Sequence, residues 1–173
     1  MRKVKGFALA LTMSVATTAT LQAAAPTGLD ALSFLLGTWV TARGDQPGVP
    51  YGSATFARDL LDRVIVRRSF ADIEPVGDGP TLHHADLMVI HADASGTIQA
   101  DFYDNEGHVI RYSVTVPAPG IASFVSEAAP GAPCYRLTYR LGDNGRLAGR
   151  FEIAPPGKPE EFAPYLAWTS TRS

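Results

Sequence analysis

The sequence predicts an all-β protein: a single antiparallel up-and-down β-barrel of about 8 to 10 strands, with a short N-terminal helix and a preceding signal peptide. Two observations predict this fold. Short segments in which apolar and polar residues alternate recur at regular spacing from residue 38 to the C-terminus. Most are separated by turns rich in Gly, Asn and Asp, which favour hairpins. A two-sheet sandwich is the alternative, but a meander of hairpins favours the barrel because closure removes exposed sheet edges.

The N-terminal segment is typical of an export signal. Three basic residues occur within the first five positions, an apolar run follows over residues 6–19, and three consecutive alanines come shortly after. The run is too short, and too rich in Ala and Thr, for a membrane span of about 20 residues. We therefore expect a signal peptide over residues 1–25 and one barrel domain over residues 26–173. The mature protein would be periplasmic or secreted, with no integral membrane span.

Composition excludes several classes of function. The net charge is −2 and falls to about −5 once the basic leader is removed, so neither nucleic acid nor an acidic membrane surface is an expected partner. Cys134 is the only cysteine, which rules out an intramolecular disulfide and a cysteine-based zinc site. Its apolar neighbours predict a buried thiol.

The elements follow one another in a simple order. A short helix is expected from Ala31 to Leu36, capped by Asp30 and ended by Gly37. It is too short to be stable alone, so it must pack against something, for instance across one mouth of the barrel. The strands that follow are expected at residues 38–43, 52–58, 63–72, 85–91, 97–103, 109–116, 121–127, 135–141, 146–153 and 165–171.

Alternation assigns faces to several strands. In the strand over 109–116, Ile110, Tyr112, Val114 and Val116 share one face, and in the strand over 135–141 the apolar face holds Tyr135, Leu137, Tyr139 and Leu141. In the strand over 63–72 the apolar set is Val64, Val66 and Phe70, and it opposes Arg67 and Ser69. Arg68 shares the apolar face of that strand.

The segment Leu36-Gly37-Thr38-Trp39 resembles the start of the first strand in the calycin superfamily, which includes lipocalins and fatty-acid-binding proteins. The wider pattern is similar to small secreted bacterial lipocalin-like proteins of unknown function. The resemblance implies that Trp39 seals the closed end of the barrel. It also implies that an arginine near the C-terminus, Arg172 here, stacks on the indole ring through a cation–π contact.

A barrel of this size either fills its interior with side chains or holds one small ligand. The mid-strand arginines point outward and pair with Asp101 or Glu152, or else one or two lie inside. An internal charge needs a partner, so we interpret Arg68 and Arg111 as contacts for an anionic group. The candidate apolar contacts are Phe56, Phe70, Phe102 and Tyr112.

The expected function is a binding protein for a small hydrophobic or anionic amphipathic molecule. No catalytic residue, metal site or cofactor is predicted: His84 and Asp86 share a face, but two residues do not make a metal site. Two alternatives stay open. One is an enzyme on the same barrel, either an isomerase or cyclase or a haem-based enzyme. The other is a structural or interaction module with a filled barrel.

Overall fold

The computed structural model describes residues 28–44 and 46–173, and these form a closed, all-antiparallel barrel of ten strands. The expected signal peptide over residues 1–25 lies outside the described residues. The elements are η1 (Gly28–Leu35), β1 (Gly37–Thr41), β2 (Pro50–Asp59), β3 (Val64–Ile73), β4 (Leu82–Ala92), β5 (Ile98–Asp104), β6 (Val109–Ala118), β7 (Ile121–Ser126), β8 (Cys134–Leu141), β9 (Leu147–Ala154) and β10 (Ala163–Arg172).

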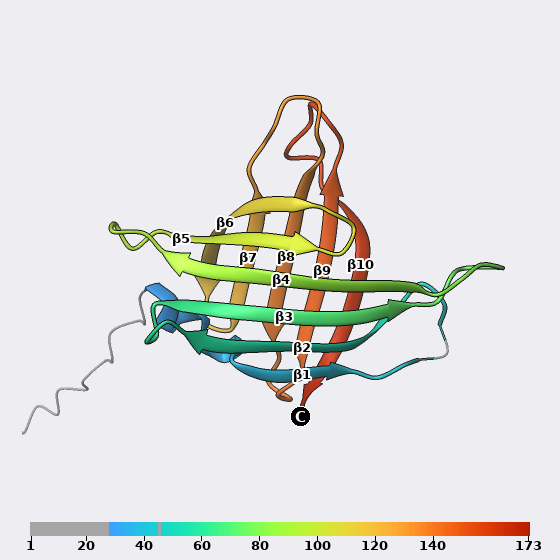
Figure 1. Cartoon of the computed structure of the whole chain (residues 1–173), viewed down its shortest axis with the longest axis horizontal. Coiled ribbons are helices and arrows are strands. Elements are labelled where there is room, and N and C mark those ends of the chain that lie inside the picture. The colour runs from blue at the N-terminus through green and yellow to red at the C-terminus, as the bar shows by residue number, and fades with distance from the viewer. Residues whose placement is uncertain (1–27, 45) are drawn as a thin grey trace, which may run out of the picture.

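Strand order follows chain order, and the first strand closes the barrel against the last. Each strand pairs with its neighbour in sequence, and β1 pairs with β10 through Trp39 opposite Arg172 and Val40 opposite Thr171. Figure 1 shows β1 to β5 crossing the strands β7 to β10 behind them at a steep angle. The predicted up-and-down barrel is therefore confirmed, and the sandwich alternative is wrong.

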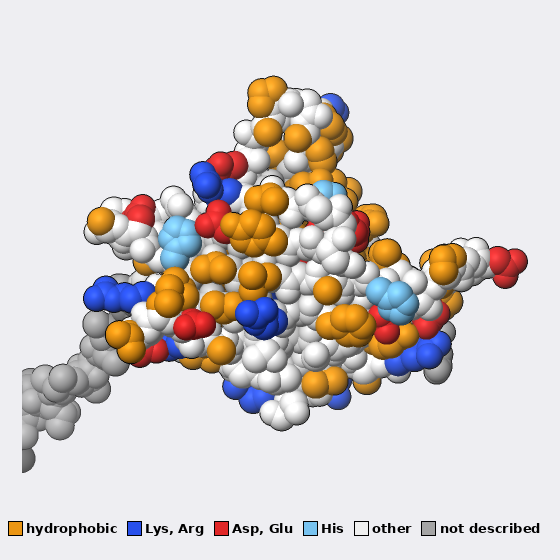
Figure 2. Space-filling model, in the orientation of Figure 1, with side chains coloured by type: hydrophobic (Ala, Val, Ile, Leu, Met, Phe, Trp, Pro, Cys, Tyr) orange, Lys and Arg blue, Asp and Glu red, His pale blue; other side chains and the backbone are white. Residues whose placement is uncertain are grey.

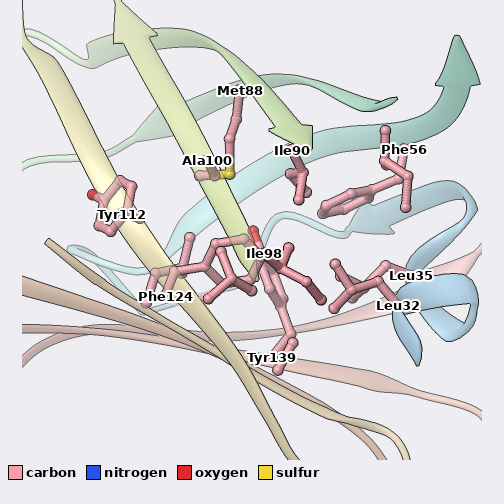
Figure 3. Packing of buried hydrophobic residues seen from close by; sticks show 14 of the residues in the cluster. Leu32, Leu35, Phe56, Met88, Ile90, Ile98, Ala100, Tyr112, Phe124 and Tyr139 are labelled. Carbon is pink, nitrogen blue, oxygen red and sulfur yellow. The ribbon is translucent and has the colours of Figure 1, made fainter. Parts of the chain in front are cut away.

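The N-terminal helix covers one end of the barrel, as expected. It is a 3-10 helix that begins at Gly28 rather than at Ala31, so Asp30 lies inside it and is not its cap. The Asp30 carboxylate instead accepts a hydrogen bond from Arg58 of β2 at 2.6 Å. Leu32 and Leu35 are fully buried and point into the barrel interior, where Figure 3 shows them beside the core residues. The helix is thus held by its apolar face.

Trp39 and Arg172 join this helix to the barrel. The Trp39 indole is 1% exposed, and its Nε1 donates a hydrogen bond to the Leu35 carbonyl oxygen at 2.7 Å. The Arg172 guanidinium lies 4.5 Å from the indole centre and donates to the Leu36 carbonyl at 2.6 Å. A Cβ at Gly37, whose φ is +110°, would lie 2.8 Å from Arg172 Nη1. The contact implied by the calycin resemblance is present.

A chain of aromatic rings fills the middle of the barrel. Phe102, Tyr112, Phe124, Tyr139 and Phe56 follow one another in edge-to-face pairs, with ring centres 5.6 to 6.4 Å apart. This geometry is favoured by the ring quadrupoles. The inward faces predicted for β6 and β8 are confirmed, because Tyr112, Leu137 and Tyr139 are all buried.

The face predicted for β3 is wrong. The residues that point inward are Ile65 and Arg67, while Val64, Val66 and Arg68 lie on the outer face. The apolar outer side chains of β3 continue onto β4, β5 and β6, and Figure 2 shows apolar side chains gathered on this side of the molecule. Because β3 carries apolar residues on both faces, alternation alone selected the wrong one.

Three of the mid-strand arginines pair with carboxylates on the outer face, as expected. Arg111 Nε lies 3.3 Å from Asp101, while Arg136 and Arg150 lie 2.7 and 3.0 Å from the two oxygens of Glu152. These contacts follow directly from the register of the paired strands. Within the described part of the chain, no helix is long and apolar enough to cross a membrane.

Candidate functional site

The barrel holds a cavity of about 360 Å³ that opens at the end away from η1. Its lining includes Thr41 at the end of β1 and Leu82 at the start of β4, whereas η1 adjoins the opposite ends of these strands. The volume falls within the range of about 300–1,000 Å³ that is typical of small-molecule sites. The interior is therefore not completely filled by side chains.

One wall of the cavity is apolar and aromatic. Tyr135 of β8 and Phe151 of β9 stack with ring centres 5.7 Å apart, and Trp168 of β10 continues the wall. The Trp168 ring lies directly against Gly149, where an added Cβ would approach Cε2 to 2.2 Å. The missing side chain at Gly149 is what leaves room for the indole.

The opposite wall is polar and is built around a buried ion pair. Arg67 of β3 and Asp86 of β4 project inward, and Arg67 Nη1 donates to Asp86 Oδ1 at 2.8 Å. Their side chains are only 8% and 2% exposed. Burial by itself lowers the pKa of Arg67, but Tyr139 and Asp86 outweigh it and hold that pKa above its usual value. Arg67 therefore stays charged, and Asp86 is its salt-bridge partner inside the barrel.

His84 extends this polar wall toward the mouth. Its Nε2 lies 3.4 Å from Asp86 Oδ2, and its Nδ1 lies 3.2 Å from Glu106 Oε1 on the turn between β5 and β6. The ring stacks on Phe102 with the planes 17° apart. The hydrogen bond to Asp86, assisted by Glu106, raises the pKa of His84 despite its partial burial. The predicted shared face of His84 and Asp86 is confirmed.

Asp104 completes the polar wall next to Asp86, its partner in the β4–β5 register. Burial opposes ionisation of Asp104, yet its bonds to the backbone NH and the ring of His108, and to the NH of Glu106, hold its pKa below the usual range. Asp104 is therefore an ionised group that is already satisfied by its own hairpin. Its charge nevertheless faces the cavity.

Two polar atoms at the floor of the cavity lack hydrogen-bond partners among the described residues. They are Arg67 Nε and Tyr139 Oη, and both are buried. The guanidinium carbon of Arg67 lies 6.0 Å from the centre of the Tyr139 ring, so the two groups are neighbours. Burial, only partly offset by Arg67, raises the pKa of Tyr139 to about 12 and keeps its hydroxyl protonated. Arg67 Nε–H can only donate, whereas the protonated Tyr139 hydroxyl can donate or accept.

The structure brings some of the predicted ligand contacts to the cavity and not others. Phe102 and Tyr112 line it, and Phe70, which is half exposed, borders it. Phe56 lies beneath the floor, with its ring centre 6.0 Å from the guanidinium carbon of Arg67. Arg68 and Arg111, the predicted anion contacts, do not belong to the lining.

The face assigned to β3 accounts for the expected position of Arg68, whereas Arg111 belongs to β6, on the face opposite Tyr112. Arg68 is exposed on the outer face beside Leu87, and Arg111 is held by Asp101. The interior arginine is instead Arg67. Its signal in the sequence was the inward-facing acid Asp86, but only the register between β3 and β4 reveals that the two side chains meet.

Within residues 28–44 and 46–173, no group of three or more His, Cys, Asp and Glu side chains is arranged to hold a metal ion. Comparison with protein-family models and with curated proteins finds no match to this chain. The arrangement itself offers an apolar surface for the body of a small molecule. It also offers charged groups and two free donors for a polar end.

Proposed function

We propose that this protein binds a small amphipathic molecule inside its barrel, as a calycin-like carrier that acts in the periplasm or outside the cell. The observation that carries the proposal is the open cavity of about 360 Å³ between an aromatic wall and a polar one. A filled structural barrel would need no such space. Two features extend the support: the closed end formed by η1 and Trp39, and the apolar leader before residue 26.

The two walls suggest how such a ligand would lie. Its apolar body would pack against Tyr135, Phe151 and Trp168, where burial contributes about 25 cal/mol per Å² of apolar surface removed from water. Its polar end would reach the Arg67–Asp86 pair, since a buried polar group needs hydrogen-bond partners. A ligand with both parts would contact both walls of the cavity, whereas a purely polar ligand would make no apolar contact with the aromatic wall.

Uptake of a fluorescent apolar probe tests the proposal. The full chain, titrated with N-phenyl-1-naphthylamine, is expected to give a saturable rise in emission with one site per barrel. Ser69→Phe places a ring from β3 into the cavity and is expected to abolish the rise. Ser113→Phe makes the same change on the exposed outer face of β6 and serves as the matched control. Equal binding by both variants, or no saturable binding by the parent protein, would contradict the proposal.

A further inference from the structure

We infer that the polar group of the ligand is a neutral hydrogen-bond acceptor, such as a ketone, ester or amide carbonyl, and not a carboxylate. This inference rests on the proposed function, because it concerns the ligand of the same cavity. It differs from the anionic ligand expected from the sequence. Two independent features of the polar wall carry it: its charge balance and its unpartnered donors.

The charge balance disfavours an anion. Arg67 is the one cation at the floor among the described residues, and Asp86 already neutralises it at 2.8 Å. Two further carboxylates face the cavity, Asp104, whose side chain is 4% exposed, and Glu106 at the mouth. The two histidines beside them, His108 and His84, are each already paired with a carboxylate. A ligand carboxylate would lose its hydration and meet no unpaired positive charge.

The unpartnered donors favour an acceptor. Arg67 Nε–H and the Tyr139 hydroxyl come from β3 and β8, on opposite sides of the interior, and both residues line the cavity. A buried donor without a partner carries a desolvation cost, which an entering acceptor can relieve. A carbonyl oxygen has two lone pairs, so one oxygen can accept from both groups. Because both atoms are covered by neighbouring side chains, an entering oxygen has to displace some of these side chains to reach them.

Three ten-carbon probes that differ only in their polar end test this inference. The probes are 2-decanone, decanoate and decane, each used at pH 8 to displace N-phenyl-1-naphthylamine from the full chain. We expect 2-decanone to displace the probe at a concentration at least tenfold lower than decanoate or decane does. Decanoate binding as tightly as 2-decanone would overturn the inference. So would decane binding as tightly as the ketone, or a failure of all three to displace a probe that does bind.

Single substitutions test whether the preference for 2-decanone depends on the unpartnered donors and on the charge balance of the polar wall. Tyr139→Phe removes one donor, and it is expected to weaken the binding of 2-decanone five- to tenfold and to leave the binding of decane unchanged. Tyr103→Phe on the outer face of β5 is expected to change the binding of neither probe. Asp86→Asn removes the counter-ion of Arg67 and is expected to strengthen the binding of decanoate at least tenfold. If Asp86→Asn does not fold, the comparison of Tyr139→Phe with Tyr103→Phe still tests the inference. Equal binding of 2-decanone by these two variants would overturn it.

Failure of this inference and failure of the proposed function give different results. If the naphthylamine probe never enters the barrel, the proposed function fails and the ligand class loses its basis. If the probe enters and Ser69→Phe excludes it, but decanoate competes as well as 2-decanone, the protein remains a carrier. Only the neutral-acceptor assignment is then wrong.

Discussion

Replacing Asp86 with Asn is expected to destabilise the barrel by about 3 kcal/mol, because it leaves the Arg67 cation buried without its counter-ion. The two side chains are 8% and 2% exposed and lie 2.8 Å apart. Removing one member of such a pair costs about 3–5 kcal/mol. Asn keeps an oxygen that can still accept from Arg67, which places the expected loss at the lower end of that range.

Urea unfolding followed by circular dichroism measures this loss. With a denaturant dependence of about 2 kcal/mol per molar urea, the midpoint should fall by about 1.5 M. Replacing both partners, as Arg67→Met with Asp86→Leu, should restore stability to within about 1 kcal/mol of the parent, because no buried charge is then left alone. A loss below about 1 kcal/mol for Asp86→Asn, or a double variant less stable than either single one, would refute the reasoning.

Three further substitutions probe other parts of the barrel. Arg172→Ala removes the stack on Trp39 and the bonds to the Phe34 and Leu36 carbonyls, and should lower the melting temperature by about 4 °C. Arg172→Lys should restore part of this loss. Gly149→Ala forces the Trp168 ring to move and should cost about 1–3 kcal/mol, with a shift in tryptophan emission that an unmoved ring would not give. The raised pKa of His84 means that its stabilising contribution is complete below about pH 6.5 and is lost as the pH rises through the folded-state pKa. His84→Gln should therefore remove the loss of stability that begins as the pH rises above about 6.5, and an unchanged profile would contradict that assignment.

The strand pattern was predictable where one face of a strand is clearly apolar. In β8, Leu137 and Tyr139 alternate with Thr138 and Arg140, so the buried face follows from the period of two. The helix across one mouth of the barrel could also be anticipated, because a short apolar turn cannot be stable unless it packs against something. The face of β8 follows from local sequence, and the position of the helix follows from its need for a packing partner.

The floor of the cavity was not predictable, because the faces of β3 do not separate apolar from polar residues in the usual way. β3 has valines on its outer face and an arginine on its inner one, an arrangement that alternation interprets the wrong way round. Arg67 is stable inside only because Asp86, in the next strand, lies within hydrogen-bond distance. That contact is set by the register of paired strands, and register is fixed by the packing of the whole barrel and not by one segment.

The most direct measurement of where a ligand binds is the change in amide and side-chain NMR shifts when 2-decanone is added to isotope-labelled protein. The account predicts saturable shifts at inward-facing residues of the cavity, such as Tyr112, Leu137 and Trp168, with little change at outer-face residues such as Ser113. Shifts confined to the outer face of β3 to β6, or none at saturating ketone, would contradict it.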